Sequence, residues 1–274
     1  MSGKRSQRRA RHRIEVLYRP GRHLSDQRLA SLSGELRAIG ETCLHPLPEY
    51  QCFLPGREAL ADKLLAVARR PDGTMDGFCS AVLLPVRGVG EVLHLGLTCV
   101  LPAGRGAGLT HRLTTRLVTS YMLWHGNPLR TIWVSNVACV LSSLGNFALH
   151  FDRVYPSPLD ARPPGAKHWL IAEAFDRDYR AHAHIQDWAT FDRATFVFRK
   201  SGRGTAFQKD PDDTRYHHRD PVLNRFYADL LCFEDGDELL QVGTVSMLRL
   251  VSYLAGGKRR GVGKRVNKKR RQGL

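Results

Sequence analysis

The chain has 274 residues, and 42% of them are hydrophobic, which suits a globular protein with one sizeable core. No apolar run approaches the roughly 20 residues that cross a bilayer. No apolar segment follows the basic N-terminus either, so we expect neither a transmembrane segment nor a secretory signal. The six cysteines include no C-x-x-C pair, which argues against a zinc ribbon or a redox motif. We therefore expect a reducing, cytoplasmic setting.

The net charge of +16 is concentrated at the two ends of the chain. Residues 1–13 hold six basic side chains, residues 258–274 hold nine, and neither stretch has an acidic one, so the body between them is close to neutral. We expect disordered basic arms at 1–12 and 258–274. Such arms can bind nucleic acid or another polyanion by counterion release, and a solubilising or tethering role stays open.

The first hundred residues are expected to form strands and helices that lead into an antiparallel hairpin. Turns are marked by Pro71-Asp72-Gly73 and by Gly88-Val89-Gly90. In the second hairpin strand, apolar Leu93, Leu95, Leu97 and Cys99 alternate with polar or small residues, as in a half-buried strand. The expected elements are a strand over 13–18, a helix over 25–39, a helix over 57–69, and hairpin strands over 77–86 and 91–101.

A glycine-rich turn follows the hairpin, with Gly104, Gly106 and Gly108 between a strand and a helix. Glycine lets the backbone come close to a ligand, and the following helix points its free N–H groups and the positive end of its dipole at the turn. A phosphate is the natural occupant of such a turn, although an ordinary strand-to-helix turn stays open. The apolar stripe expected on the helix is Leu109, Leu113, Leu117, Tyr121 and Trp124.

The remaining residues continue as a mixture of strands and helices. Residues 147–155 fit either a helix or a strand, and residues 159–190 have no clear assignment. The other expected elements are a strand over 131–135, a helix over 138–144 that Gly145 ends, a strand over 195–199, and helices over 221–231 and 238–254. This order is typical of an α+β fold with a mixed, mostly antiparallel sheet flanked by helices, followed by a helical extension over 201–257.

The loop and its surroundings resemble the GCN5-related N-acetyltransferase (GNAT) superfamily, whose signature is [Gln/Arg]-x-x-Gly-x-[Gly/Ala] between a strand and a helix. The matching residues are Ala103-Gly104-Arg105-Gly106-Ala107-Gly108, with Ala103 where the family prefers Gln or Arg. A second similarity is the strand end Val134-Ser135-Asn136, followed by Gly145 and Phe147, although the family's Tyr in this helix is absent. The resemblance covers residues 13–200 and implies a GNAT-like domain that binds acyl-CoA.

The resemblance further implies that acetyl-CoA or another acyl-CoA is the co-substrate and that an amine accepts the acyl group. The coenzyme-binding residues that follow from it are Gly104, Arg105, Gly106, Ala107 and Gly108 at the diphosphate, the backbone N–H groups near Cys99 and Leu101 at the pantetheine and the carbonyl, and Asn136 on the pantetheine arm.

Acyl transfer to an amine needs a proton acceptor for the amine and a proton donor for the departing thiolate. Glu91 and His94 lie on the strand that leads into the loop, and the ordinary pKa of histidine suits a base. Both residues also fit solvated or satisfied strand positions. Because the expected Tyr is absent, Ser143 is the candidate acid, with His150 and Tyr155 as alternatives.

Other functions stay open at this point. A GNAT-like protein without chemistry would bind nucleic acid through its arms, and the missing Tyr and Ala103 favour that alternative. Transfer of a longer acyl chain from an acidic carrier protein fits the near-neutral body less well. His182 with His184, and His217 with His218, are interpreted as loop histidines rather than metal ligands, and no metal is expected.

Overall fold

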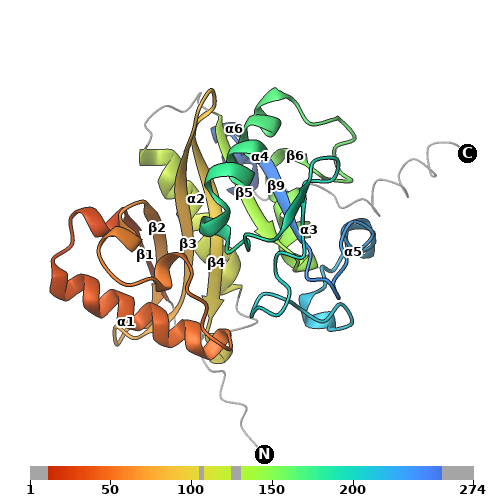
Figure 1. Cartoon of the computed structure of the whole chain (residues 1–274). Helices are drawn as coiled ribbons and strands as arrows, with labels where there is room; N and C mark the ends of the chain where they lie inside the picture. Colours follow the sequence, from red (N-terminus) through yellow and green to blue (C-terminus); the bar gives the residue numbers. More distant parts are fainter. Residues whose placement is uncertain (1–11, 105–107, 125–130, 255–274) are drawn as a thin grey trace, which may run out of the picture.

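The computed structural model describes residues 12–104, 108–124 and 131–254, which form a nine-stranded sheet with helices on both faces (Figure 1). The strand order is β1-β2-β3-β4-β5-β9-β8-β7, and β6 pairs with β9 beside this path. Among these strands, only β4 and β5 pair in parallel. The strands are β1 (Arg13–Tyr18), β2 (Lys63–Arg69), β3 (Met75–Val86), β4 (Gly90–Val100), β5 (Ile132–Ala138), β6 (Asp152–Tyr155), β7 (Thr190–Asp192), β8 (Val197–Arg199) and β9 (Glu238–Val245). The expected mixed, mostly antiparallel sheet is confirmed.

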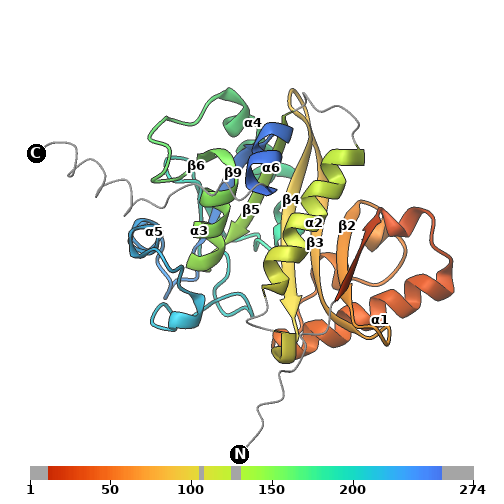
Figure 2. The same ribbon diagram turned by 180° about the vertical axis from the view of Figure 1, so that it is seen from behind.

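Helices α1 and α4 cover one face of the sheet, and α2, α3 and α6 cover the other (Figures 1 and 2). Helix α5 packs on α3 through Leu223 and Tyr227. Short 3-10 turns used below are η2 (Gln51–Phe53), η4 (Pro102–Gly104) and η5 (Arg180–Ala183). The helices are α1 (Asp26–Cys43), α2 (Leu109–Trp124), α3 (Leu141–His150), α4 (Ala166–Asp178), α5 (Pro221–Ala228) and α6 (Met247–Leu254).

The amphipathic patterns identify the first strand, the first helix and the helix after the glycine-rich loop. Strand β1 has the expected bounds, and α1 begins after Ser25 as expected but continues past Gly40 to Cys43. On α2 the buried stripe includes Leu109, Leu113, Leu117 and Tyr121. Trp124, placed on the same stripe, is instead 47% exposed and packs edge-on against Tyr18 of β1.

Three expected elements are wrong. Residues 63–69, expected within a helix over 57–69, form β2, because the run is buried on both faces of the sheet and therefore shows no strand alternation. Residues 238–245, expected to be helical, form β9, which is also buried along its whole length. Gly145 does not end a helix but lies inside α3, where a Cβ would come within 2.7 Å of the His218 ring.

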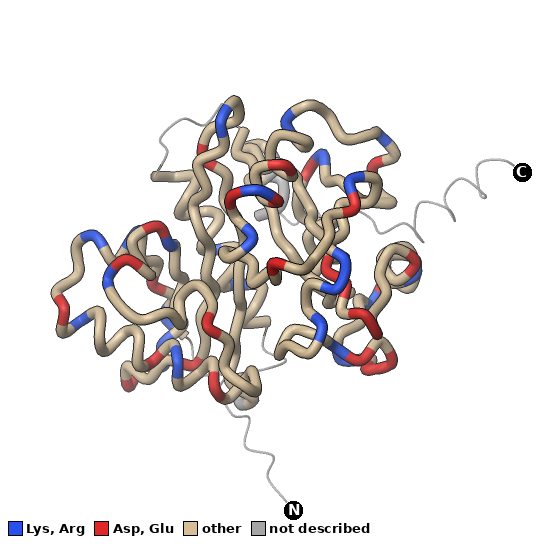
Figure 3. Tube along the Cα trace, viewed as in Figure 1, with Lys and Arg blue, Asp and Glu red and all other residues tan. Residues whose placement is uncertain are grey.

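The charges agree with a near-neutral body. Figure 3 shows acidic and basic residues interspersed over the described chain, with no single sign dominating a region. No described helix combines the length and the apolar character needed to cross a bilayer. The basic arms expected at 1–12 and 258–274 lie outside the described residues, except for His12, whose ring Nε2 lies 2.7 Å from Asp76 Oδ2.

Candidate active site

Strands β4 and β5 pair over a short stretch and then separate. Val92–Leu95 of β4 lie beside Trp133–Asn136 of β5. Beyond that point, β4 continues against β3 alone and β5 continues against β9. We call the region between Gly96–Val100 and Val137–Ala138 the wedge, and Gly96 its apex. The two strands are therefore splayed apart at the wedge (Figure 1).

The backbone of β4 determines which N–H groups face the wedge. Leu101 donates its N–H to the Asp76 carbonyl at 2.9 Å, and this bond contradicts the predicted role of the Leu101 amide at the coenzyme. Antiparallel alternation turns the N–H of Cys99 towards β3 as well, since Cys99 lies opposite Phe78. By the same alternation the N–H of Thr98 faces the wedge.

An irregularity in β4 explains the burial of Cys99. The register with β3 shifts between Cys79 and Ala81, so the side chains of β4 change face at Gly96. Leu93 therefore packs with α2, whereas Cys99 packs with α1. A hydrogen bond with Cys43 and burial both raise the pKa of the Cys99 thiol, which stays protonated.

Asn136 is the last residue of β5 that pairs with β4, so it lies at the apex of the wedge. It is 8% exposed, and its side-chain oxygen Oδ1 has no hydrogen-bond partner among the described residues. A buried acceptor without a partner costs about 1–3 kcal/mol and is a recognised mark of a ligand site. Its place agrees with the predicted contact to an amide-containing pantetheine arm.

The glycine-rich loop links η4 to α2. Gly104 donates its N–H to the Leu101 carbonyl at 2.9 Å, so this amide is already engaged, which contradicts the diphosphate contact predicted for it. Gly108 has a φ of +70°, which favours glycine, and its carbonyl accepts the N–H of Arg112 at 3.1 Å as α2 begins. A Cβ on Gly108 would have nothing within 4 Å, so no other described group crowds this position. The predicted diphosphate ligands Arg105, Gly106 and Ala107 lie outside the described residues.

His94 lies on β4, two residues before the apex, and is 1% exposed. Its ring Nδ1 lies 3.0 Å from the Ser135 hydroxyl, and its ring centroid lies 4.7 Å from that of Phe175 on α4. Burial, together with the nearby charges of His182 and Lys63, lowers the pKa of His94 to about 3. His94 therefore stays neutral at physiological pH. Helix α4 and η5, which cover His94, lie within residues 159–190, which have no clear assignment from the sequence.

Glu91 and Ser143 lie away from the apex. The Glu91 carboxylate accepts hydrogen bonds from Arg19 at 2.6 Å and from the Tyr121 hydroxyl at 2.7 Å, at the opposite end of β4 from the wedge. Ser143 is an exposed residue in the first turn of α3. The structure does not bring these two predicted residues together with His94.

Gln51 is a buried residue at the apex that the sequence did not single out. Its amide Nε2 donates to the Tyr50 hydroxyl at 2.8 Å and to the His182 carbonyl at 2.7 Å, and its Oε1 accepts the Ser80 hydroxyl at 3.1 Å. A Cβ on Gly96 would lie 2.2 Å from that oxygen. Gly96 inside a strand was the available signal, because such a glycine often marks a close approach.

A second missed group is the buried carboxyl of Glu238, at the start of β9. The Ser201 hydroxyl donates to it at 2.5 Å. Burial raises the pKa of Glu238 to about 7, against the effect of the Ser201 hydrogen bond. Burial, and then the charge of Glu238, also raise the pKa of Tyr50 well above its ordinary value. Because residues 238–254 were expected to form a helix, Glu238 was not considered as a site residue.

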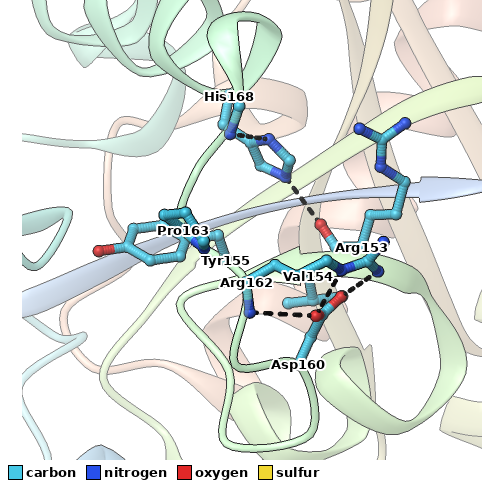
Figure 4. Close-up of a pocket in the computed structure, with 8 residues that line it drawn as sticks. Arg153, Val154, Tyr155, Asp160, Arg162, Pro163 and His168 are labelled. Atoms are coloured by element: carbon cyan, nitrogen blue, oxygen red, sulfur yellow. Dashed lines mark hydrogen bonds and ion pairs between the residues drawn. The ribbon is translucent and has the colours of Figure 1, made fainter.

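A separate pocket of about 80 Å³ lies at the start of α4, away from the wedge (Figure 4). Its polar groups pair with one another. Arg162 binds Asp160 at 2.5 Å, and the His168 ring accepts the Gly165 N–H at 3.2 Å while its Nε2 lies 2.7 Å from the Arg153 carbonyl. These pairings leave the wedge as the better candidate site.

No family model and no curated protein matches the sequence. Many solved structures that match are GNAT-family acetyltransferases. One from Brucella melitensis, in complex with acetyl-CoA, is 21% identical, with 50% of this chain and 80% of that chain covered and a TM-score of 0.33. One from Escherichia coli, in complex with CoA, is 18% identical, with 47% and 63% covered and a TM-score of 0.27. A GNAT-family structure from Desulfovibrio desulfuricans is 12% identical, with 86% and 99% covered and a TM-score of 0.33.

Proposed function

We propose that this chain is an acyl-CoA-dependent N-acyltransferase that transfers an acetyl group to an amine. The observation that carries the proposal is the buried Oδ1 of Asn136, which has no partner among the described residues, at the point where β4 and β5 separate. An extended chain with amide N–H groups, such as pantetheine, would satisfy that acceptor while it lies between the two strands.

The surrounding residues fit the other parts of such a substrate. The N–H of Thr98 faces the wedge and suits a carbonyl of the pantetheine arm. The stretch from Gly104 to Gly108 precedes α2, and the first turn of a helix of this length offers N–H groups to a diphosphate. Acyl-CoA supplies a thioester whose carbonyl an amine can attack. The neutral His94 and its Ser135 partner would shape the wall beside the apex.

Isothermal titration with acetyl-CoA tests this proposal. Asn136→Ala should weaken binding about tenfold or more, since one hydrogen bond to a buried group is lost, and Gly106→Trp should abolish binding. Asn146→Ala, an exposed position on α3, is the matched control and should bind like the wild type. Absence of binding by the wild-type protein would refute the proposal.

The basic arms motivate a finer proposal about the acceptor. Six basic residues in 1–13 and nine in 258–274 suit an amine carried on a polyanion or on a protein associated with one. Removal of 1–11 and 258–274 should then weaken nucleic-acid binding at low salt and slow turnover on such acceptors. The alternative, a protein that binds nucleic acid without chemistry, predicts the same salt-dependent binding but no release of thiol from acetyl-CoA.

A further inference from the structure

His182 lies on η5, and its ring is next to a carboxylate from the segment that leads into β2. Its ring Nε2 lies 3.6 Å from Oδ2 of Asp62, the residue that precedes β2. Burial opposes the charge on Asp62, but the ring of His182 and the Lys63 ammonium outweigh it and hold the pKa of this carboxyl below its ordinary value. The carboxylate therefore stays ionised and favours the tautomer with the proton on Nε2.

The other ring nitrogen of His182, Nδ1, is buried, and no described residue forms a hydrogen bond with it. The ring also packs edge-on against Tyr179, with the two centroids 5.6 Å apart. A histidine with one nitrogen oriented by a carboxylate and the other free as an acceptor is the arrangement of a general base.

Gln51 connects this histidine to the apex of the wedge. The Gln51 side-chain amide donates to the His182 carbonyl at 2.7 Å. The same amide occupies the space that a Cβ on Gly96 would take. The charge of His182 also contributes to the lowered pKa of His94. The charged and titratable groups around His182 are Asp62, Lys63, His94 and Tyr179.

We propose that the Asp62–His182 dyad is the general base of the acyl transfer, an inference that rests on the proposed function. The amine nitrogen bonds to the thioester carbonyl carbon, and the C–S bond breaks. His182 Nδ1 accepts the proton that the nitrogen loses, directly or through one water, and Asp62 stabilises the imidazolium. The thiolate takes that proton back from His182 and leaves as the free thiol, so the cycle needs no separate acid.

Competing groups are less suited to this role. His94 stays neutral, with a pKa of about 3, so it accepts a proton poorly. The Glu91 carboxylate is engaged by Arg19 and Tyr121. The Glu238 carboxyl is already held by the Ser201 hydroxyl.

Thiol release from acetyl-CoA in the presence of a panel of simple primary amines is the kinetic test. His182→Gln should lower kcat 10²–10⁴-fold and remove the acidic limb of the pH–rate profile, while the dissociation constant for acetyl-CoA stays within about twofold. Asp62→Asn should lower kcat less and shift that limb. His217→Gln, a loop histidine, is the control and should leave both unchanged. Equal kcat and equal pH profiles for wild type and His182→Gln overturn the dyad.

Nitrogen-15 NMR of labelled histidines tests the dyad in the absence of an amine substrate. In the full-length wild-type protein, His182 should carry its proton on Nε2, and acetyl-CoA should shift its Nδ1 signal more than that of His217. A proton on Nδ1, or equal shifts for both residues, would overturn the dyad. A wild-type protein that fails to bind acetyl-CoA at all would instead refute the proposed function.

Discussion

Replacement of Glu238 by Gln gives the sharpest test of the electrostatics of the β9 segment. Glu238 is 5% exposed, and burial raises its pKa from 4.5 to about 7. The folded chain therefore binds more protons than the unfolded chain between these values, so the contribution of this group favours folding at low pH and is lost as the pH rises through 7. Gln cannot ionise and has no such dependence.

The expected size follows from the two pKa values. At about 1.4 kcal/mol per pKa unit, ionisation of Glu238 costs the wild-type protein about 3 kcal/mol by pH 7.5. Urea unfolding at constant ionic strength, at pH 4.5, 6 and 7.5, should show the Gln variant gaining that amount relative to the wild type across the series. Other titrating groups are common to both proteins and cancel in the difference.

Glu234→Gln, at an exposed position just before β9, is the control and should show no growing difference. A difference between Glu238→Gln and the wild type that stays constant within about 1 kcal/mol from pH 4.5 to 7.5 would show that the carboxyl is not desolvated as the structure requires.

Two further predictions follow from close packing and burial. Gly96→Ala should lower the free energy of unfolding by about 1–3 kcal/mol, because its Cβ would collide with the Gln51 amide. Gly34→Ala is the control, since Gly34 lies in open space on α1, and it should raise the free energy of unfolding by up to about 1 kcal/mol in the same urea titration. His94→Gln should make the protein less sensitive to acid, because the lowered pKa of His94 gives a stabilisation that is present above pH 6.5 and lost as the pH falls towards 3. Equal acid-unfolding midpoints for His94→Gln and the wild type would contradict this.

Much of the fold follows from local patterns, and the two strands that were assigned to helices share one cause. Strand β3 is also buried along nearly its whole length, but the turns on either side of it marked the hairpin with β4, and the stripe on α2 was predicted because that helix buries one face. Residues 63–69 and 238–245 have sheet neighbours on both edges and helices or loops over both faces, so their apolar runs carry no period that separates a strand from a helix. Burial on both faces removes the alternation of apolar and polar residues by which a strand is recognised.

The candidate site was predicted only in part, for a related reason. Asn136 and the loop glycines lie near each other in sequence and carry motif information. His182 lies more than 100 residues along the chain from Gln51 and from Asp62, and it meets them only in the folded protein. No spacing within the sequence relates them, so the dyad required the topology.

Gly96 links these observations, because the absence of a side chain at this residue matters for the β4 strand, for the apex of the wedge and for the Asp62–His182 dyad. The β4 irregularity falls at this residue, the pairing with β5 ends just before it, and its open side admits the Gln51 amide that fixes the His182 backbone. A side chain here would push Gln51 away from Ser80 and from His182 together. Variants of Gly96 should therefore change both acetyl-CoA affinity and the pH–rate profile, whereas variants of Asn136 should change affinity alone. If both positions altered only affinity, Gln51 would not couple the apex to the base.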